Sequence, residues 1–158
     1  KLEEKNIAGA ENPTDDRPDY EKNPHMEMPK VIIDGNEYLG YLIIPSLGLE
    51  LPILSSWSYP KIRIAPARYE GSVYLNNMIL LAHNYRAHFG NIHLLDTGDL
   101  VQFKDMDNNL FDFVVEKKEE LYKMQVDEMV AGNWDLTLFT CTLSGEARTT
   151  IRCKRIDK

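Results

Sequence analysis

Short runs of hydrophobic residues, separated by turn signals, dominate the chain from residue 31 onward. Most runs alternate apolar with polar positions or are rich in β-branched and aromatic residues, which is typical of strands. Clusters of Gly, Asn and Asp interrupt them. The predicted strands are 31–33, 38–44, 49–54, 78–82, 100–104, 110–116, 136–140 and 148–153. A series of short strands with turns between them predicts an all-β barrel or sandwich with short helices.

The segments between these strands lack the pattern. Residues 55–65 and 89–95 are each predicted to hold a short helix. Residues 67–77 contain a glycine and an asparagine pair, which predicts a loop. Residues 117–130 have some helical spacing but also fit a continuation of the preceding strand, so both interpretations stay open.

Residues 1–30 are polar, acidic on balance and rich in proline, with no hydrophobic period. Such a segment buries too little apolar surface to order itself, which predicts a flexible N-terminal leader. Residues 31–158 then form one domain, long enough to bury a core. No stretch is long and apolar enough to span a bilayer, and no signal peptide is visible.

The net charge of −7 disfavours nucleic-acid binding, because a phosphate-backbone binder needs a basic face. The two cysteines, Cys141 and Cys153, make no disulfide framework, and without a CxxC pair no structural zinc site is expected. If their strands are antiparallel and turn near Gly145, Cys153 lies opposite residues well upstream of Cys141. The two sulfurs are then too far apart to bond.

Cys141 ends the apolar run 136–140, and Arg148 begins the next predicted strand after a turn at 144–146. A strand, a loop and a returning strand bring Cys141 near Arg148 in space. A thiol beside a fixed positive charge is an arrangement that makes a nucleophile. The alternative is a buried structural cysteine, because free cysteine is among the most buried residue types.

The segment Thr137-Leu138-Phe139-Thr140-Cys141 resembles the Thr-Leu-x-Thr-Cys signature of sortases, the cysteine transpeptidases of Gram-positive cell surfaces. Sortases place an arginine at the start of the next strand, where Arg148 stands. Residues 40–45 and 51–53 resemble the opening strands of the family, and 80–84 resemble the stretch around its histidine. The resemblance covers roughly residues 38–156. It implies an eight-stranded sortase-type β-barrel.

The resemblance also implies the site. Cys141 is the expected nucleophile, His83 the acid or base, and Arg148 the group that stabilises the oxyanion. Arg152 is a rival, because strand alternation puts it on the same face as Arg148. The same alternation sends Cys153 to the other face, as an inert core residue. Two further candidates are the side chain of Thr140, lining the substrate groove, and the backbone N–H of Thr142, a second oxyanion donor.

The implied substrate is a surface protein or pilin with an LPxTG-like sorting signal. The implied acceptor is an amine of a cell-wall precursor or a pilin lysine, and no cofactor is required. The implied location is the outer face of the cell membrane, held by an N-terminal anchor absent from this chain. Some sortases bind calcium near a strand connection. The acidic residues that could do so here also fit a solvated charged face: Glu116, Glu119, Glu120, Asp127 and Glu128.

Several alternatives remain open. The same residues suit a hydrolytic cysteine peptidase, and a non-enzymatic β-barrel surface module would keep Cys141 in its core. Some pilus-building sortases cover the active site with a lid anchored by an Asp-Pro-aromatic motif. The nearest match here, Asp19-Tyr20, lacks the proline. His88 and His93 are predicted surface residues.

Overall fold

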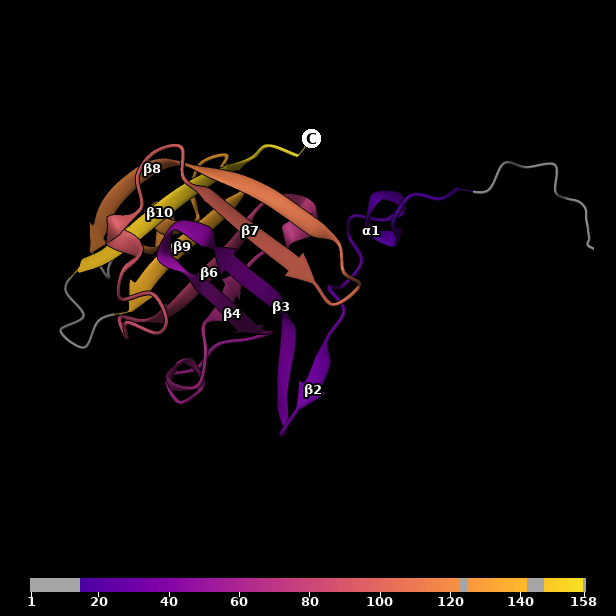
Figure 1. Cartoon of the computed structure of the whole chain (residues 1–158), viewed down its shortest axis with the longest axis horizontal. Helices are drawn as coiled ribbons and strands as arrows, with labels where there is room; N and C mark the ends of the chain where they lie inside the picture. Colours follow the sequence, from indigo (N-terminus) through magenta and orange to yellow (C-terminus); the bar gives the residue numbers. More distant parts are fainter. Residues whose placement is uncertain (1–14, 123–124, 142–146, 158) are drawn as a thin grey trace, which may run out of the picture.

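The computed structural model describes residues 15–122, 125–141 and 147–157. Within these ranges nine strands account for most of the fold, joined by two short α-helices and four 3₁₀ turns (Figure 1). The strands are β2 Val31–Ile33, β3 Asn36–Ile44, β4 Leu49–Leu54, β5 Ala67–Glu70, β6 Met78–His83, β7 Leu100–Asp105, β8 Leu110–Tyr122, β9 Leu136–Cys141 and β10 Ala147–Arg155. The helices are α1 Asp19–Lys22 and α2 Val126–Val130, and the 3₁₀ turns are η1 Pro45–Leu47, η2 Lys61–Arg63, η3 Val73–Leu75 and η4 Ile92–Leu94.

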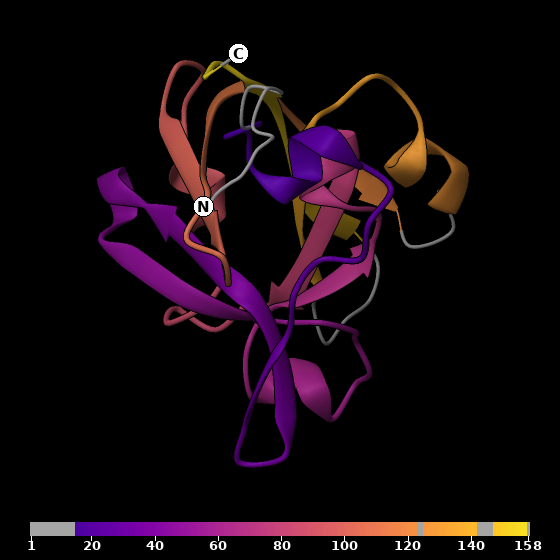
Figure 2. The ribbon, with the colours of Figure 1, turned by 90° about the vertical axis from the view of Figure 1, so that its right-hand side faces the viewer.

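Eight of the described strands close into a barrel. Their order is β3-β4-β5-β6-β9-β10-β8-β7, and β7 pairs back onto β3. Strand β2 pairs with β3 outside the ring and projects from the barrel with the turn that joins them (Figures 1 and 2). The pairs β4–β5 and β6–β9 are parallel, and the other pairs in the ring are antiparallel. The predicted eight-stranded barrel is confirmed.

The barrel closes where β3 and β7 approach each other closely at Gly40. This residue pairs with Asp105 of β7 and has a φ of +155°. A Cβ atom there would lie 2.1 Å from the carbonyl oxygen of Lys104 and 2.9 Å from the Phe103 ring. Only glycine fits at this seam, the line of contact between β3 and β7.

We expect Gly40→Ala to lower the free energy of unfolding by about 1–3 kcal/mol or more, because the seam between β3 and β7 must open to admit a methyl group. Urea unfolding checks this. Gly48→Ala is the matched control, because its φ of +65° is strained but no heavy atom lies within 4 Å of the added Cβ. The control should cost only about 1 kcal/mol. Equal losses in the two variants would contradict the role of the seam.

Two packed clusters lie on opposite faces of the barrel wall. The larger cluster fills the interior and takes alternate positions of the strands, among them Leu80 and Ala82 of β6 and Leu138 of β9. The intervening positions, such as Leu81 and Phe139, form a smaller outer cluster with residues of η2 and α2. Strand alternation therefore gives β6 and β9 two buried faces, which explains their continuous apolar sequences.

Some local predictions need correction. Residues 67–77, predicted to be loop, contain strand β5 and the turn η3. Strand β5 was missed because it is short and mostly polar, and pairing with β6 rather than hydrophobicity holds it in place. The open choice for 117–130 resolves into both forms, since β8 runs to Tyr122 and α2 begins at Val126. The short helices predicted in 55–65 and 89–95 are the 3₁₀ turns η2 and η4.

Residues 15–30, the described part of the leader, pack against the barrel. Tyr20 of α1 is buried and stacks on Tyr74 with ring centroids 4.8 Å apart. It also contacts Phe111 at the start of β8, and its hydroxyl accepts a hydrogen bond from Arg155 at the end of β10. These contacts all lie at the end of the barrel away from the last residues of β6 and β9 (Figure 1). Asp19-Tyr20 is therefore not a lid over Cys141, and the domain boundary at residue 30 stays a prediction.

Candidate active site

Three neighbouring strands bring the predicted catalytic positions into one row. In the parallel pair β6–β9, His83 is the register partner of Cys141. In the antiparallel pair β9–β10, Phe139 is the partner of Thr150. The same antiparallel order puts Arg148, near the start of β10, at the end of the sheet where β9 finishes with Cys141. His83 and Arg148 therefore lie on the two strands that flank the strand of Cys141.

His83 ends β6 on the outer face, one position after the interior residue Ala82. Its side chain is buried, and Nε2 has no hydrogen-bond partner among the described residues. The ring of Tyr85 lies against it, with centroids 4.9 Å apart and planes 31° apart. A buried polar atom without a partner is rare in folded proteins and often marks a functional group. The imidazole is thus held by packing while one nitrogen stays free to exchange a proton.

A tight turn in the loop after β6 holds Tyr85 against His83. The carbonyl of Tyr85 accepts hydrogen bonds from the N–H groups of His88 and Gly90, at 2.9 and 2.7 Å. A Cβ atom on Gly90 would lie 2.4 Å from the carbonyl oxygen of Asn84, so the turn requires glycine. Phe89 is fully buried and anchors the loop in the interior cluster.

His88 is not the surface residue that the sequence predicts. It is half-buried, and its ring lies 5.6 Å from that of Tyr85. Burial lowers the pKa of His88 below its ordinary value, and the neighbouring His83 lowers it further. His88 therefore favours its neutral form beside His83.

Arg148 lies on the same outer face. Its guanidinium stands 5.3 Å from the centroid of the Phe139 ring, a cation–π arrangement. Phe139 is fully buried and receives the ring of Tyr69 edge-on at 5.3 Å. Among the residues that the structure places, no carboxylate forms an ion pair with Arg148. Within the described ranges, its guanidinium therefore has the ring of Phe139 as its partner.

Arg152, the predicted rival of Arg148, is already engaged. Its side chain is 3% exposed and makes four hydrogen bonds. The acceptors are the carboxylate of Glu119, the hydroxyl of Thr137, and the carbonyl oxygens of Glu128 and Met129. With four of its five N–H donors bonded inside the protein and its side chain buried, Arg152 is not placed to serve an oxyanion.

A family model for the Sortase domain matches residues 42–156, close to the range covered by the resemblance in the sequence. The chain belongs to the sortase family. Membership in this family places it among transpeptidase enzymes. No curated protein matches the chain significantly.

Solved sortases share the fold. Sortase C from Clostridium perfringens SM101 is 26% identical with a TM-score of 0.65, over 77% of this chain and 71% of that one. A second Clostridium perfringens sortase C structure, which contains the C-terminal cell wall sorting motif, is 25% identical with a TM-score of 0.67, over 86% and 81%. Sortase C of Streptococcus pneumoniae, described with its pilin substrate specificity, is 20% identical with a TM-score of 0.66, over 77% and 70%. Sortase C1 of GBS Pilus Island 1 and sortase A from Corynebacterium diphtheriae also match, over 65% and 62% of their length.

The second cysteine of this sortase lies in the interior. Cys153 is a free thiol, fully buried and paired in register with Leu136, well upstream of Cys141 as predicted. Burial raises the pKa of the Cys153 thiol far above its ordinary value, and the nearby charges of Asp135 and Glu116 raise it further. A thiol that neither ionises nor meets solvent does not react readily.

We expect iodoacetamide to leave Cys153 unmodified in the folded protein and to modify it after unfolding in urea. Peptide mapping by mass spectrometry reads both sites, with Cys141 as the internal comparison. Rapid labelling of Cys153 in the native state would contradict its burial.

The remaining predicted groups have different surroundings. Thr140 is buried, and its hydroxyl accepts a hydrogen bond of 3.1 Å from the N–H of Thr149. This bond joins β9 to β10 beside the row, while a groove-lining role for Thr140 stays a prediction. Thr142 lies outside the described residues.

Two of the acidic residues considered for calcium bond other side chains of the protein. Glu119 pairs with Arg152 at 2.8 Å, and Glu120 accepts a hydrogen bond from the hydroxyl of Thr149. Nowhere in 15–122, 125–141 and 147–157 do three His, Cys, Asp or Glu residues gather as a metal site would require. In the same ranges, no helix has the length and apolar character needed to cross a bilayer.

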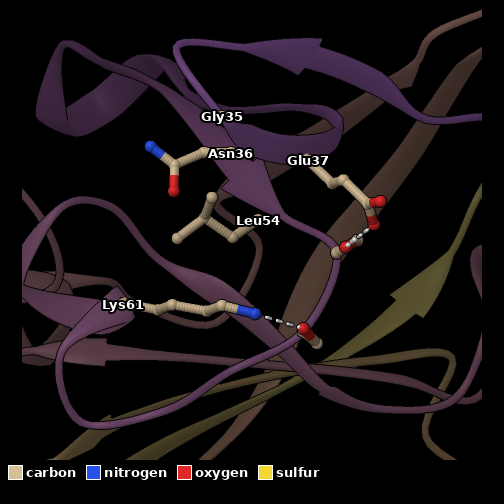
Figure 3. A pocket seen from close by; sticks show the side chains of 7 residues that line it. Gly35, Asn36, Glu37, Leu54 and Lys61 are labelled. Carbon is tan, nitrogen blue, oxygen red and sulfur yellow. Dashed lines mark hydrogen bonds between the residues drawn. The ribbon is translucent and has the colours of Figure 1, made fainter.

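A polar pocket of about 260 Å³ lies away from the row, between the β2–β3 turn, the end of β4 and η2 (Figure 3). Its charged groups are occupied within the protein: Lys61 donates to the hydroxyl of Ser56, and Glu37 accepts from that of Ser55. Leu54, at its base, is separated from β6 by strand β5. The pocket is therefore not part of the candidate active site.

Proposed function

We propose that this sortase domain cleaves an LPxTG-like sorting signal through a thioester on Cys141 and transfers the acyl group to an amine. The observation that supports the proposal is the strand order β6-β9-β10, in which His83 is the register partner of Cys141 and β10, with Arg148 near its start, lies on the other side of β9. A nucleophile, an acid–base group and a fixed positive charge are the parts that acyl transfer needs.

The first half-reaction forms the thioester. The Cys141 thiolate attacks the backbone carbonyl carbon of the sorting-signal threonine, and the carbonyl oxygen becomes an oxyanion. The guanidinium of Arg148 donates hydrogen bonds to that oxyanion, and the N–H of Thr142 is a candidate second donor. The protonated imidazole of His83 gives its proton to the departing amine, the peptide C–N bond breaks, and the acyl group remains on sulfur.

The second half-reaction forms a new amide. The acceptor amine attacks the thioester carbonyl, neutral His83 takes a proton from the amine, and the thiolate departs. One amide bond is broken and one is made, so no cofactor or external energy source is needed. The free nitrogen of His83 and its buried surroundings suit this two-way proton transfer.

Substrate and location extend the proposal. A sorting signal on a surface protein or pilin is supported by the Clostridium perfringens sortase C that holds a sorting motif. A pilin lysine or an amine of a cell-wall precursor would be the acceptor. We propose that the domain acts on the outer face of the cell membrane and is held there by an N-terminal anchor.

The test offers quenched fluorescent peptides carrying several LPxTG-type motifs to the wild type, with and without a small amine. We expect cleavage, with the amine joined to the threonine carboxyl in the product by mass spectrometry. A free acid as the sole product, even with amine present, would instead identify a hydrolytic peptidase. No cleavage of any motif, together with resistance of Cys141 to alkylation, would favour a non-enzymatic surface module.

A further inference from the structure

The side chain of Arg152, on the outer face of the barrel, makes four hydrogen bonds. Its Nε donates to Glu119 at 2.8 Å, and Nη2 donates to the carbonyl of Glu128 at 2.6 Å. Its Nη1 donates to the carbonyl of Met129 at 2.7 Å and to the hydroxyl of Thr137 at 3.0 Å. One guanidinium on β10 thus joins β8, β9 and α2.

The two carbonyl groups identify what Arg152 holds in place. Glu128 and Met129 belong to the last turn of α2, where the carbonyl of Glu128 also accepts a hydrogen bond of 3.4 Å from the N–H of Ala131. Helix α2 has only five residues and no side-chain cap at its start, so it is not stable by itself. Figure 2 shows the segment after β8 standing at one side of the barrel. A cation at its carboxyl end fastens it there.

Helix α2 borders the approach to the catalytic row. Met129 is 3% exposed and packs in the outer cluster with Leu121 and Phe139. Phe139 lies beneath the guanidinium of Arg148 and two residues before Cys141. A peptide lying on the outer face with its carbonyl at Cys141 therefore passes beside α2.

We propose that Arg152 is a positioning residue that holds α2 as one wall of the peptide groove beside Cys141. This inference rests on the proposed function, because it assigns the wall to the sorting peptide. Arg152 touches neither the substrate nor the reacting atoms. It acts by fixing the distance between α2 and the row, and so by setting which peptides fit.

The chemistry of the site requires arginine. The acceptors belong to three elements and surround the planar fork, which a lysine ammonium cannot match. A buried charge is tolerated only when its hydrogen-bond donors are satisfied. Arg152→Lys keeps the positive charge but loses the hydrogen bonds that hold α2. It therefore distinguishes an effect of the position of α2 from an effect of the charge.

The matched control is Arg155→Lys, the same substitution three residues further along β10. Arg155 also bonds a carboxylate, that of Asp157, but it lies at the opposite end of the barrel beside Tyr20. Glu119→Gln serves as a milder variant, because it removes the charge of one acceptor and leaves three contacts in place. It keeps the test usable if Arg152→Lys fails to fold.

The experiment measures amide hydrogen exchange and peptide kinetics on the full chain. In Arg152→Lys we expect exchange of the α2 amides to quicken by about tenfold or more. We expect KM for the sorting peptide to rise by about tenfold while kcat stays within about twofold, since the row is untouched. Glu119→Gln should shift both readouts in the same direction by less, and Arg155→Lys should shift neither.

Three outcomes would overturn the inference: unchanged exchange in α2, faster exchange with an unchanged KM, or a loss confined to kcat. Failure of the proposed function is a separate result, because it appears as absent turnover in the wild type. In that case a peptidyl chloromethyl ketone is used to label Cys141. If the reagent concentration for half-maximal labelling were the same in wild type and Arg152→Lys, α2 would not be a wall of the peptide groove.

Discussion

Replacing Cys141 by alanine should lower the rate of peptide cleavage by at least about 10³-fold, because no thioester can form without the sulfur. The fold should survive, since the change is one atom at the end of β9. A quenched-peptide assay with excess enzyme measures the loss, and thermal unfolding confirms that the variant is folded.

Cys153→Ala is the control for that substitution, because it removes the other cysteine of the chain. Cys153 is buried in the interior cluster, so the expected loss is in stability, by about 1 kcal/mol, with kcat retained. Cleavage that survives in Cys141→Ala, or disappears in Cys153→Ala while the protein is folded, would contradict the assignment.

Arg148→Lys should lower kcat by about 10²–10³-fold with a smaller change in KM, because the lost hydrogen bonds are made chiefly in the transition state. Lysine keeps the positive charge over Phe139 but has no fork of donors. Steady-state kinetics with the sorting peptide separates kcat from KM.

The Arg148 prediction differs from that for Arg152 in a measurable way. Arg148 is half-buried and pairs with none of the described carboxylates, so its substitution should change the unfolding free energy little. Arg152 is buried with four hydrogen bonds, so its substitution should reduce stability. If Arg148→Ala kept a near wild-type kcat, the oxyanion role would have to pass to another donor.

The row itself could be predicted because it depends on strand pattern and register. An apolar run that ends at His83, another that ends at Cys141 and a strand that begins near Arg148 are visible in the sequence. Each strand alternates faces, so the inward direction of Cys153 followed from the outward direction of Arg148. The role of His83 came only with the family resemblance, and its place beside Cys141 depends on the parallel pairing of β6 with β9, which the sequence does not show.

Contacts between distant elements could not be predicted. Arg152 appeared as a rival for the oxyanion because alternation alone does not show that α2 covers it. Tyr85 and His88 carried no periodic signal, and their places beside His83 depend on the close turn at Gly90. The leader appeared too polar to pack, yet two of its apolar side chains, Tyr20 and Met28, are buried against the barrel.

Direct observation of the acyl-enzyme tests the central claim most closely. The wild type is mixed with a sorting peptide, quenched in acid, and its intact mass and peptide map are recorded. The account predicts a mass increase equal to the peptide up to its threonine, located on Cys141, removed by hydroxylamine and converted to an amide by an added amine. An adduct on another residue, or steady cleavage with no adduct on Cys141 at any time, would contradict it.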